Sequence, residues 1–212
     1  MKNGIAYRLG ALTAIAALSL STPAVAAPFT SCAAPSRDGS ATISGTSTLN
    51  SYYPGNGSAN EGSTSISIGA VDSRGVATGI QAGDLLLIMQ VQGASLVTNN
   101  SIYYGGGNGS GRGGISLILA GNYEYVTAAN SVGAGGGTLQ LRSPLQNSYL
   151  DAEPGTGTSG VQNGRRSYQI VKVRQYRDLN ISGTITAPVW NGATGGLVAL
   201  DQCLDSVHDR AH

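Results

Sequence analysis

Residues Gly83–Ala94 read GDLLLIMQVQGA, and this stretch decides the fold class. Gly83 and Asp84 form a turn signal, and the run from Leu85 to Val91 is apolar except for Gln90. An apolar run of about 4–8 residues bounded by turn residues is typical of a strand that is buried on both faces. We therefore expect a central β-strand here, with a core on each side of it.

Shorter alternating segments lie on both sides of this strand. In Ser63–Ala70, Ile66 and Ile68 alternate with serines, which is the two-residue period of a half-buried strand. Gly-rich loops at 99–114 and 151–164 and several tight turns separate further segments of this kind, at residues 115–119, 123–128, 138–142, 168–176, 179–186 and 197–200. Glycines and β-branched residues interrupt every candidate helical window after residue 26. The sequence predicts an all-β fold, a β-barrel or β-sandwich, with no helix after the first 26 residues.

The spacing changes after Asp178. Residues 178–187, DLNISGTITA, form a short strand, a glycine step and a second short strand, which is typical of one rung of a β-solenoid. A rung buries its apolar face only when several rungs stack. We therefore divide the chain into a signal peptide (1–26), a loosely packed Ser/Gly/Thr-rich leading segment (27–61), a barrel or sandwich domain (62–177), the start of a β-solenoid (178–200) and an aberrant tail (201–212).

The tail, DQCLDSVHDRAH, continues none of these patterns. It holds both histidines of the chain, His208 and His212, together with Cys203. We expect the chain to break off inside a domain, as a truncated or frame-shifted product, so these reactive residues should carry little function. Cys32 is the other cysteine, and the sequence leaves open whether it pairs with Cys203 or both stay unpaired.

The first 26 residues have the features of a secretory signal peptide. Lys2 and Arg8 precede an apolar stretch at 9–20, and Ala24–Ala26 supply small residues for cleavage after Ala26. The apolar stretch is too short for a transmembrane helix, which needs about 20 residues. Without residues 1–26, 10 basic and 11 acidic residues remain, and no basic excess is available for nucleic acid. We expect a secreted or cell-surface protein with no transmembrane segment and no nucleic-acid partner.

Five segments stand out in combination: GDLLLIMQVQGA (83–94), GNYEYVTA (121–128), LRSPLQNSY (141–149), YQIVKVRQY (168–176) and TAPVWNGATGGLVAL (186–200). Together they resemble the N-terminal region of large secreted or surface-displayed bacterial proteins of adhesin-like type. The resemblance runs from about Gly62 to Leu200, and the pattern departs at Gln202. It implies a cell-envelope component that continues into further β rungs and Gly-rich repeats. That family brings no assigned catalytic residues.

Catalysis is tested by elimination. Residues 27–200 contain no histidine, so a Ser-His-Asp or Cys-His arrangement and a His/Cys zinc site are excluded there. A glycoside hydrolase needs only two carboxylates across a cleft, but no acidic pair has diagnostic spacing. Asp84 is expected as a turn residue that accepts backbone N–H bonds.

Calcium is a further possibility, with Asp151, Glu153 and Asn147 as hard oxygen ligands. Our prediction is no catalytic residue, no metal site and no small-molecule cofactor.

Tyrosines supply the candidate ligand contacts. Six residues are predicted to bind a ligand such as an anionic glycan or a cell-envelope component, two in the Gly-rich loop and four on one strand face: Tyr103, Tyr104, Tyr168, Lys172, Arg174 and Tyr176. The alternative for the strand face is a solvated edge whose basic residues discourage strand-to-strand association.

The sequence thus favours a non-enzymatic exported module, structural or adhesive, that forms the N-terminal part of a longer adhesin-like protein. An exported carbohydrate-active enzyme with a carboxylate pair is the second hypothesis. A truncated product without function is the third.

Overall fold

The computed structural model describes residues 37–98, 115–157 and 160–201. Every regular element in these ranges is a β-strand, fourteen in all, and none is a helix. The all-β prediction is confirmed for this part of the chain. Within it, no helix is long and apolar enough to span a bilayer. The predicted signal peptide, both cysteines, both histidines, Tyr103 and Tyr104 lie outside the described residues.

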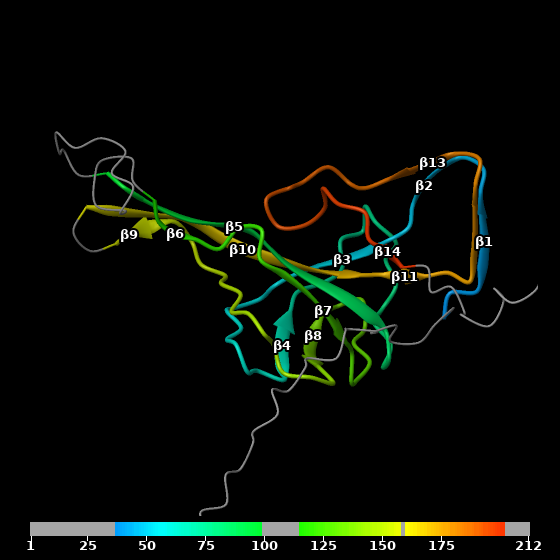
Figure 1. Ribbon diagram of the computed structural model, residues 1–212, viewed down its shortest axis with the longest axis horizontal. Helices are drawn as coiled ribbons and strands as arrows, with labels where there is room; N and C mark the ends of the chain where they lie inside the picture. The colour runs from blue at the N-terminus through cyan, green and yellow to red at the C-terminus, as the bar shows by residue number, and fades with distance from the viewer. Residues whose placement is uncertain (1–36, 99–114, 158–159, 202–212) are drawn as a thin grey trace, which may run out of the picture. The chain divides into compact units, whose positions relative to one another are not determined.

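A six-stranded antiparallel sheet contains the stretch that decided the fold class (Figure 1). Its longest strands, β5 (Leu85–Val97) and β10 (Val161–Lys172), pair with each other over most of their length. β10 also pairs with β3 (Ser51–Pro54) and β9 (Gly155–Thr156), and β5 with β6 (Ile115–Ile118) and β7 (Tyr123–Thr127). The path β3-β10-β5-β6 has two ends, so the described strands do not close into a barrel.

The apolar run of β5 has a core on each face, as expected. Leu86 and Ile88 belong to the larger hydrophobic cluster, and Leu85 and Leu87 to a second one. A two-stranded ribbon contributes to the larger cluster with Ile66, Ile68 and Leu139; its strands are β4 (Ser65–Ile68) and β8 (Gly137–Gln140). The segment after residue 186 packs Ala199 and Leu197 against the second cluster. The sheet is therefore buried on both faces around β5 and β10.

Three further strand pairs are parallel, and each joins distant parts of the chain (Figure 1). β1 (Ser40–Ile43) pairs with β12 (Asp178–Ile181), and β2 (Thr46–Thr48) pairs with β13 (Thr184–Thr186). The partners are 138 positions apart in both pairs, as in Ser40 and Asp178. β11 (Arg174–Gln175) pairs with β14 (Leu200–Asp201), where the separation is 26, as in Gln175 and Asp201.

The first two parallel pairs bring a repeated sequence into register. Both segments contain Ile-Ser-Gly-Thr, at 43–46 and at 181–184, and Ile43 lies opposite Ile181 and Thr46 opposite Thr184. The glycines at the corner lie so close that a Cβ on Gly183 would stand 2.3 Å from the carbonyl oxygen of Gly45. We call residues 40–48 the lower rung and residues 178–186 the upper rung.

The leading segment differs from the expectation of loose packing. Its residues 40–48 form the lower rung, and its residues 51–54 form β3 inside the antiparallel sheet. Tyr52 and Tyr53 are fully buried there. Ser, Thr and Gly composition suggests a loose linker, whereas here the backbone pairs with strands more than 100 residues away, as in the match of Tyr53 with Ile170.

Candidate functional site

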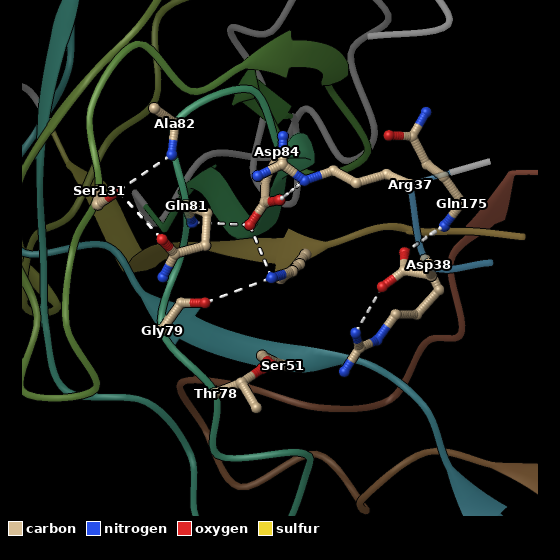
Figure 2. Close-up of polar contacts among 12 residues, drawn as sticks. Arg37, Asp38, Ser51, Thr78, Gly79, Gln81, Ala82, Asp84, Ser131 and Gln175 are labelled. Atoms are coloured by element: carbon tan, nitrogen blue, oxygen red, sulfur yellow. Dashed lines mark hydrogen bonds and ion pairs between the residues drawn. The ribbon is translucent and has the colours of Figure 1, made fainter. Parts of the chain in front are cut away.

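One buried carboxylate forms ion pairs with two basic side chains, at the point where the sheet meets the segment before β1. Asp84 immediately precedes β5, and its Oδ2 lies 2.7 Å from Nζ of Lys172, the last residue of β10. Its Oδ1 lies 2.9 Å from Nε of Arg37 (Figure 2). The Asp84 and Lys172 side chains are only 3% and 10% exposed. We call Asp84, Lys172 and Arg37 the ion-pair cluster.

Backbone groups complete the ion-pair cluster. The N–H of Gln81 donates to Oδ2 of Asp84 at 2.8 Å, so the predicted turn role of Asp84 is confirmed. Lys172 donates to the carbonyl of Gly79 at 3.3 Å. Figure 2 also shows Ser131 beside this turn, where its Oγ accepts from the Ala82 N–H at 3.2 Å. These bonds run between protein groups, so the arrangement fastens the start of β5 to the end of β10 and to Arg37.

Arg174 makes a separate ion pair two residues further on. Its Nη1 lies 2.8 Å from Oδ1 of Asp38, and its Nε donates to the carbonyl of Leu49 at 2.8 Å. The other oxygen of Asp38 accepts the Gln175 N–H at 2.7 Å (Figure 2). Lys172 and Arg174 therefore bind acids on two different segments.

The exposed strand face predicted from Tyr168, Lys172, Arg174 and Tyr176 is not present. Tyr168, Lys172 and Tyr176 are buried, and Arg174 is mostly covered. β10 lies between β3 and β5, so it is not an edge strand. Each of its faces packs in a hydrophobic cluster, with Tyr168 in the larger one and Val171 in the second. Alternation identifies residues that share a face but not which face lies in the interior.

The two tyrosines of this set are packed into cores. The Tyr168 hydroxyl donates to the carbonyl of Gly57 at 2.8 Å, and its ring lies 5.6 Å from that of Tyr149. Burial, with a smaller contribution from the charge of Asp151, raises the pKa of Tyr168 well above its ordinary value. Tyr176 packs with Ile43 and Leu49 beside the rungs, and burial raises its pKa as well.

Three carboxylates of the described residues, Asp72, Asp84 and Glu124, have structural partners. Hydrogen bonds from Arg74, supported by Thr194, hold the pKa of the Asp72 carboxyl well below its usual range. Glu124 accepts the Gln146 and Asn147 N–H groups at 2.9 and 3.0 Å, so it closes a loop. Asp84 lies in the ion-pair cluster. Each of these three carboxylates accepts hydrogen bonds from groups of the chain itself.

Of the three side chains considered as calcium ligands, Asp151 and Glu153 lie beside a cation of the chain, Arg165. The guanidinium of Arg165 pairs with Glu153 and lies 3.6 Å from Oδ1 of Asp151, while Oδ2 of Asp151 accepts the Gly57 N–H at 2.9 Å. The Asn147 N–H and side-chain amide both point to Glu124. Across residues 37–98, 115–157 and 160–201, no three His, Cys, Asp or Glu side chains gather as a metal site.

Two exposed tyrosines on β7 form a surface that the sequence reasoning did not select. Tyr123 and Tyr125 are 59% and 50% exposed, and their rings meet edge to face with centroids 6.3 Å apart. Glu124 points to the opposite face of the strand, as alternation requires. The available signal is the triplet Tyr-Glu-Tyr at 123–125, whose alternation puts both tyrosines on one face of the strand.

A pocket of about 430 Å³ lies between the distal parts of β5 and β10. Leu96, Asn163 and Arg165 are among its lining residues. The adjacent Arg166 donates to Ser95 Oγ and Asn163 Oδ1 at 3.1 and 3.0 Å. The lining of this pocket is mainly apolar, and Asn163 is the lining residue that takes part in these hydrogen bonds.

Comparison with known proteins assigns no family. No protein-family model, curated protein or solved structure matches the chain. The resemblance to adhesin-like proteins therefore stays a prediction from the five sequence segments.

Proposed function

We propose that this chain is a non-enzymatic, exported structural or adhesion module in which an antiparallel β domain interrupts the first turns of a parallel β-solenoid. The observation that carries the proposal is the register of the lower rung against the upper rung, with the same 138-residue separation in β1–β12 and β2–β13. A chain that pairs in parallel with itself twice at one separation has the geometry of stacked coils.

A third level supports this interpretation. The Asp38 N–H donates to the carbonyl of Gln175, and the Gln175 side-chain amide donates to Asp201 at 3.0 Å. Asp38, Gln175 and Asp201 thus follow one another across three successive passes of the chain. In a solenoid each pass contacts its neighbours only, which is the pattern of these contacts.

The inserted domain offers the surface for a partner. Tyr123 and Tyr125 are amphipathic rings held side by side on a strand, and such rings stack on sugars while their hydroxyls stay in water. We propose a glycan or another cell-envelope component as the partner of this pair. The buried set Tyr168, Lys172, Arg174 and Tyr176 takes no part in this proposal.

The hydrolase alternative has less support. It needs two carboxylates free to act on a substrate between them, whereas Asp72, Asp84 and Glu124 are each held by Arg, Lys or backbone donors. The ion-pair cluster accounts for Asp84 and Lys172 as a fastening between strands.

The test combines export, binding and turnover on one preparation. The chain expressed in a bacterial host with residues 1–26 is expected outside the cytoplasm with Ala27 as its first residue, measured by intact mass. A glycan array is expected to give binding that falls at least about tenfold in Tyr123→Ala/Tyr125→Ala. Val189→Ala, at an exposed position elsewhere, is the matched control.

A polysaccharide-hydrolysis screen supplies the contrary outcome. Turnover that disappears with one carboxylate-to-amide change, such as Glu124→Gln, would overturn the non-enzymatic proposal. Equal glycan binding by wild type and the double tyrosine variant would remove the tyrosine pair from it.

A further inference from the structure

The two rungs differ in how well their side chains are covered. Ile43 in the lower rung is 9% exposed, whereas Ile181, at the same position of the upper rung, is 49% exposed. Eight large hydrophobic side chains are exposed among the described residues, and half of them lie between 181 and 200: Ile181, Val189, Val198 and Leu200. Among the residues that the structure describes, Ile181 of the upper rung and three side chains of the segment after it are therefore uncovered.

The backbone of the upper rung also has an outward edge. The N–H groups of Arg177 and Thr184 donate to the carbonyls of Gly39 and Gly45 in the lower segment. Successive residues of a strand direct their backbone groups to alternate sides, so Asn180 and Ile185 direct theirs away from the lower rung. In the ranges that the structure describes, β12 and β13 each have a strand on one side only. A second parallel strand can pair with this outward edge.

The glycine corner of the rungs limits which strand can pair with this outward edge. A Cβ on Gly183 would meet the Gly45 carbonyl at 2.3 Å, so a strand laid over the upper rung needs glycine above Gly183. A strand that continued the 26-residue separation of β11 and β14 would put Asp209 there. The segment with the required aliphatic residue and glycine, at Ile43 and Gly45, is the lower rung itself.

We propose that a second copy of this chain adds its lower rung, residues 40–48, to the outward edge of the upper rung, parallel and in the register that the two rungs already share. The contribution begins at Ser40, because Asp201 already occupies the place beside Gln175. The contact joins two different surfaces, so it repeats without closing, and copies stack head to tail. This inference rests on the stacked-rung part of the proposed function and not on export or glycan binding.

Proline substitutions test each edge separately. Asn180→Pro removes an outward N–H of the upper rung. Thr42→Pro does the same for the lower rung, because Gly39 and Ile43 already direct their carbonyls to the upper segment. Both side chains are exposed. Wild type is expected to assemble with rising concentration in analytical ultracentrifugation, and each variant alone is expected to need more than about tenfold higher concentration.

Mixing the two variants gives the decisive readout. Each keeps the edge that the other has lost, so an equimolar mixture is expected to form a 1:1 complex that grows no further. Val189→Lys, at a position that is 82% exposed and outside the strands, is the control and is expected to assemble like wild type. Ile181→Lys blocks the upper edge by charge if Asn180→Pro proves unfolded by circular dichroism.

Wild type that stays monomeric at every concentration would overturn self-assembly, as would a mixture of variants that forms no complex. Gly183→Ala separates this failure from failure of the stacked rungs. If Gly183→Ala has a lowered unfolding midpoint while wild type is monomeric, the two rungs pair as described and only the self-assembly proposal is contradicted. An unchanged midpoint would contradict the close pairing of the two rungs.

Discussion

The antiparallel sheet and the parallel rungs are stabilised in different ways. Around β5 and β10, side chains fill both faces, and Leu86, Ile88 and Ile170 are completely buried. In the rungs, most side chains are small, polar and exposed, and the lower rung contributes only Ile43 as a buried residue. The sheet depends on apolar burial, whereas the rungs depend on backbone pairing, register and a tight glycine corner.

The comparison teaches where a substitution should matter. In the sheet, the volume and charge of a side chain decide stability because there is no space around it. In the rungs, the backbone path decides, and the same change in a side chain falls mostly in solvent. Matched substitutions in the two regions should therefore differ strongly.

The largest effect is expected at alkaline pH. Burial, with smaller contributions from Asp72 and Asp84, raises the pKa of Tyr52 and of Tyr53 from 10.0 to about 12. The folded state thus favours the neutral phenols. Their stabilisation is complete below pH 10 and is lost as the pH rises toward about 12. We expect the sheet to unfold in this window, with tyrosinate absorbance and loss of β circular dichroism changing together. Full tyrosine ionisation with an intact spectrum would contradict this.

The next largest effect is expected from a substitution in the ion-pair cluster. Asp84→Ala leaves Lys172 and Arg37 without their shared carboxylate, and breaking a buried pair lowers the free energy of unfolding by about 3–5 kcal/mol. Urea denaturation measures the change. The matched control is Asp178→Ala in the rungs, where the Arg177–Asp178 pair is exposed, and a much smaller change is expected. Equal losses would abolish the contrast between the regions.

Truncation of isoleucine sharpens the same contrast. Ile88→Ala creates a cavity in the larger core and is expected to lower the free energy of unfolding by about 2–5 kcal/mol. Ile181→Ala removes a half-exposed side chain and should lose a small fraction of that. Both are measured by thermal and urea unfolding, and a large loss for Ile181→Ala would mean that the upper rung is covered in solution.

At the glycine corner, a small added side chain is expected to destabilise the rungs. Gly183→Ala forces a Cβ against the Gly45 carbonyl and is expected to lose about 1–3 kcal/mol. Gly45→Ala is the control from the same motif, since a Cβ there has no neighbour within 4 Å. The difference between the two midpoints in urea measures how tightly the rungs are stacked, and identical midpoints would mean that they are not.

Local patterns predicted most strands but not their partners. The apolar run at 85–91 lies in β5, and β4 lies within the alternating segment at 63–70. Asp178–Ala187 was predicted as a rung, and its two short strands are present as β12 and β13. Its partner was missed, because pairing over 138 residues leaves no local trace except the shared Ile-Ser-Gly-Thr.

The burial of the four strand residues in the candidate site could not be predicted for a related reason. Tyr168 and Lys172 do share a face of β10, as their even spacing requires. Whether that face is inside depends on the segments that pack on it, such as β4 and β8, which come from other parts of the chain. Conversely, Tyr123 and Tyr125 alternate like core residues, but β7 leaves them at the surface. The two-residue period alone does not show which face of a strand is buried.

The distance along the chain between the rungs also has a kinetic consequence. Residues 40–48 leave the ribosome long before their partners at 178–186. Ser40 and Asp178 are 138 positions apart, and synthesis over that separation takes roughly 7–28 s at about 5–20 residues per second. During that time the lower rung has no template, and contacts of such high sequence separation form late in folding. The corner glycines are thus expected to meet only after the sheet between them has assembled and brought the two ends together.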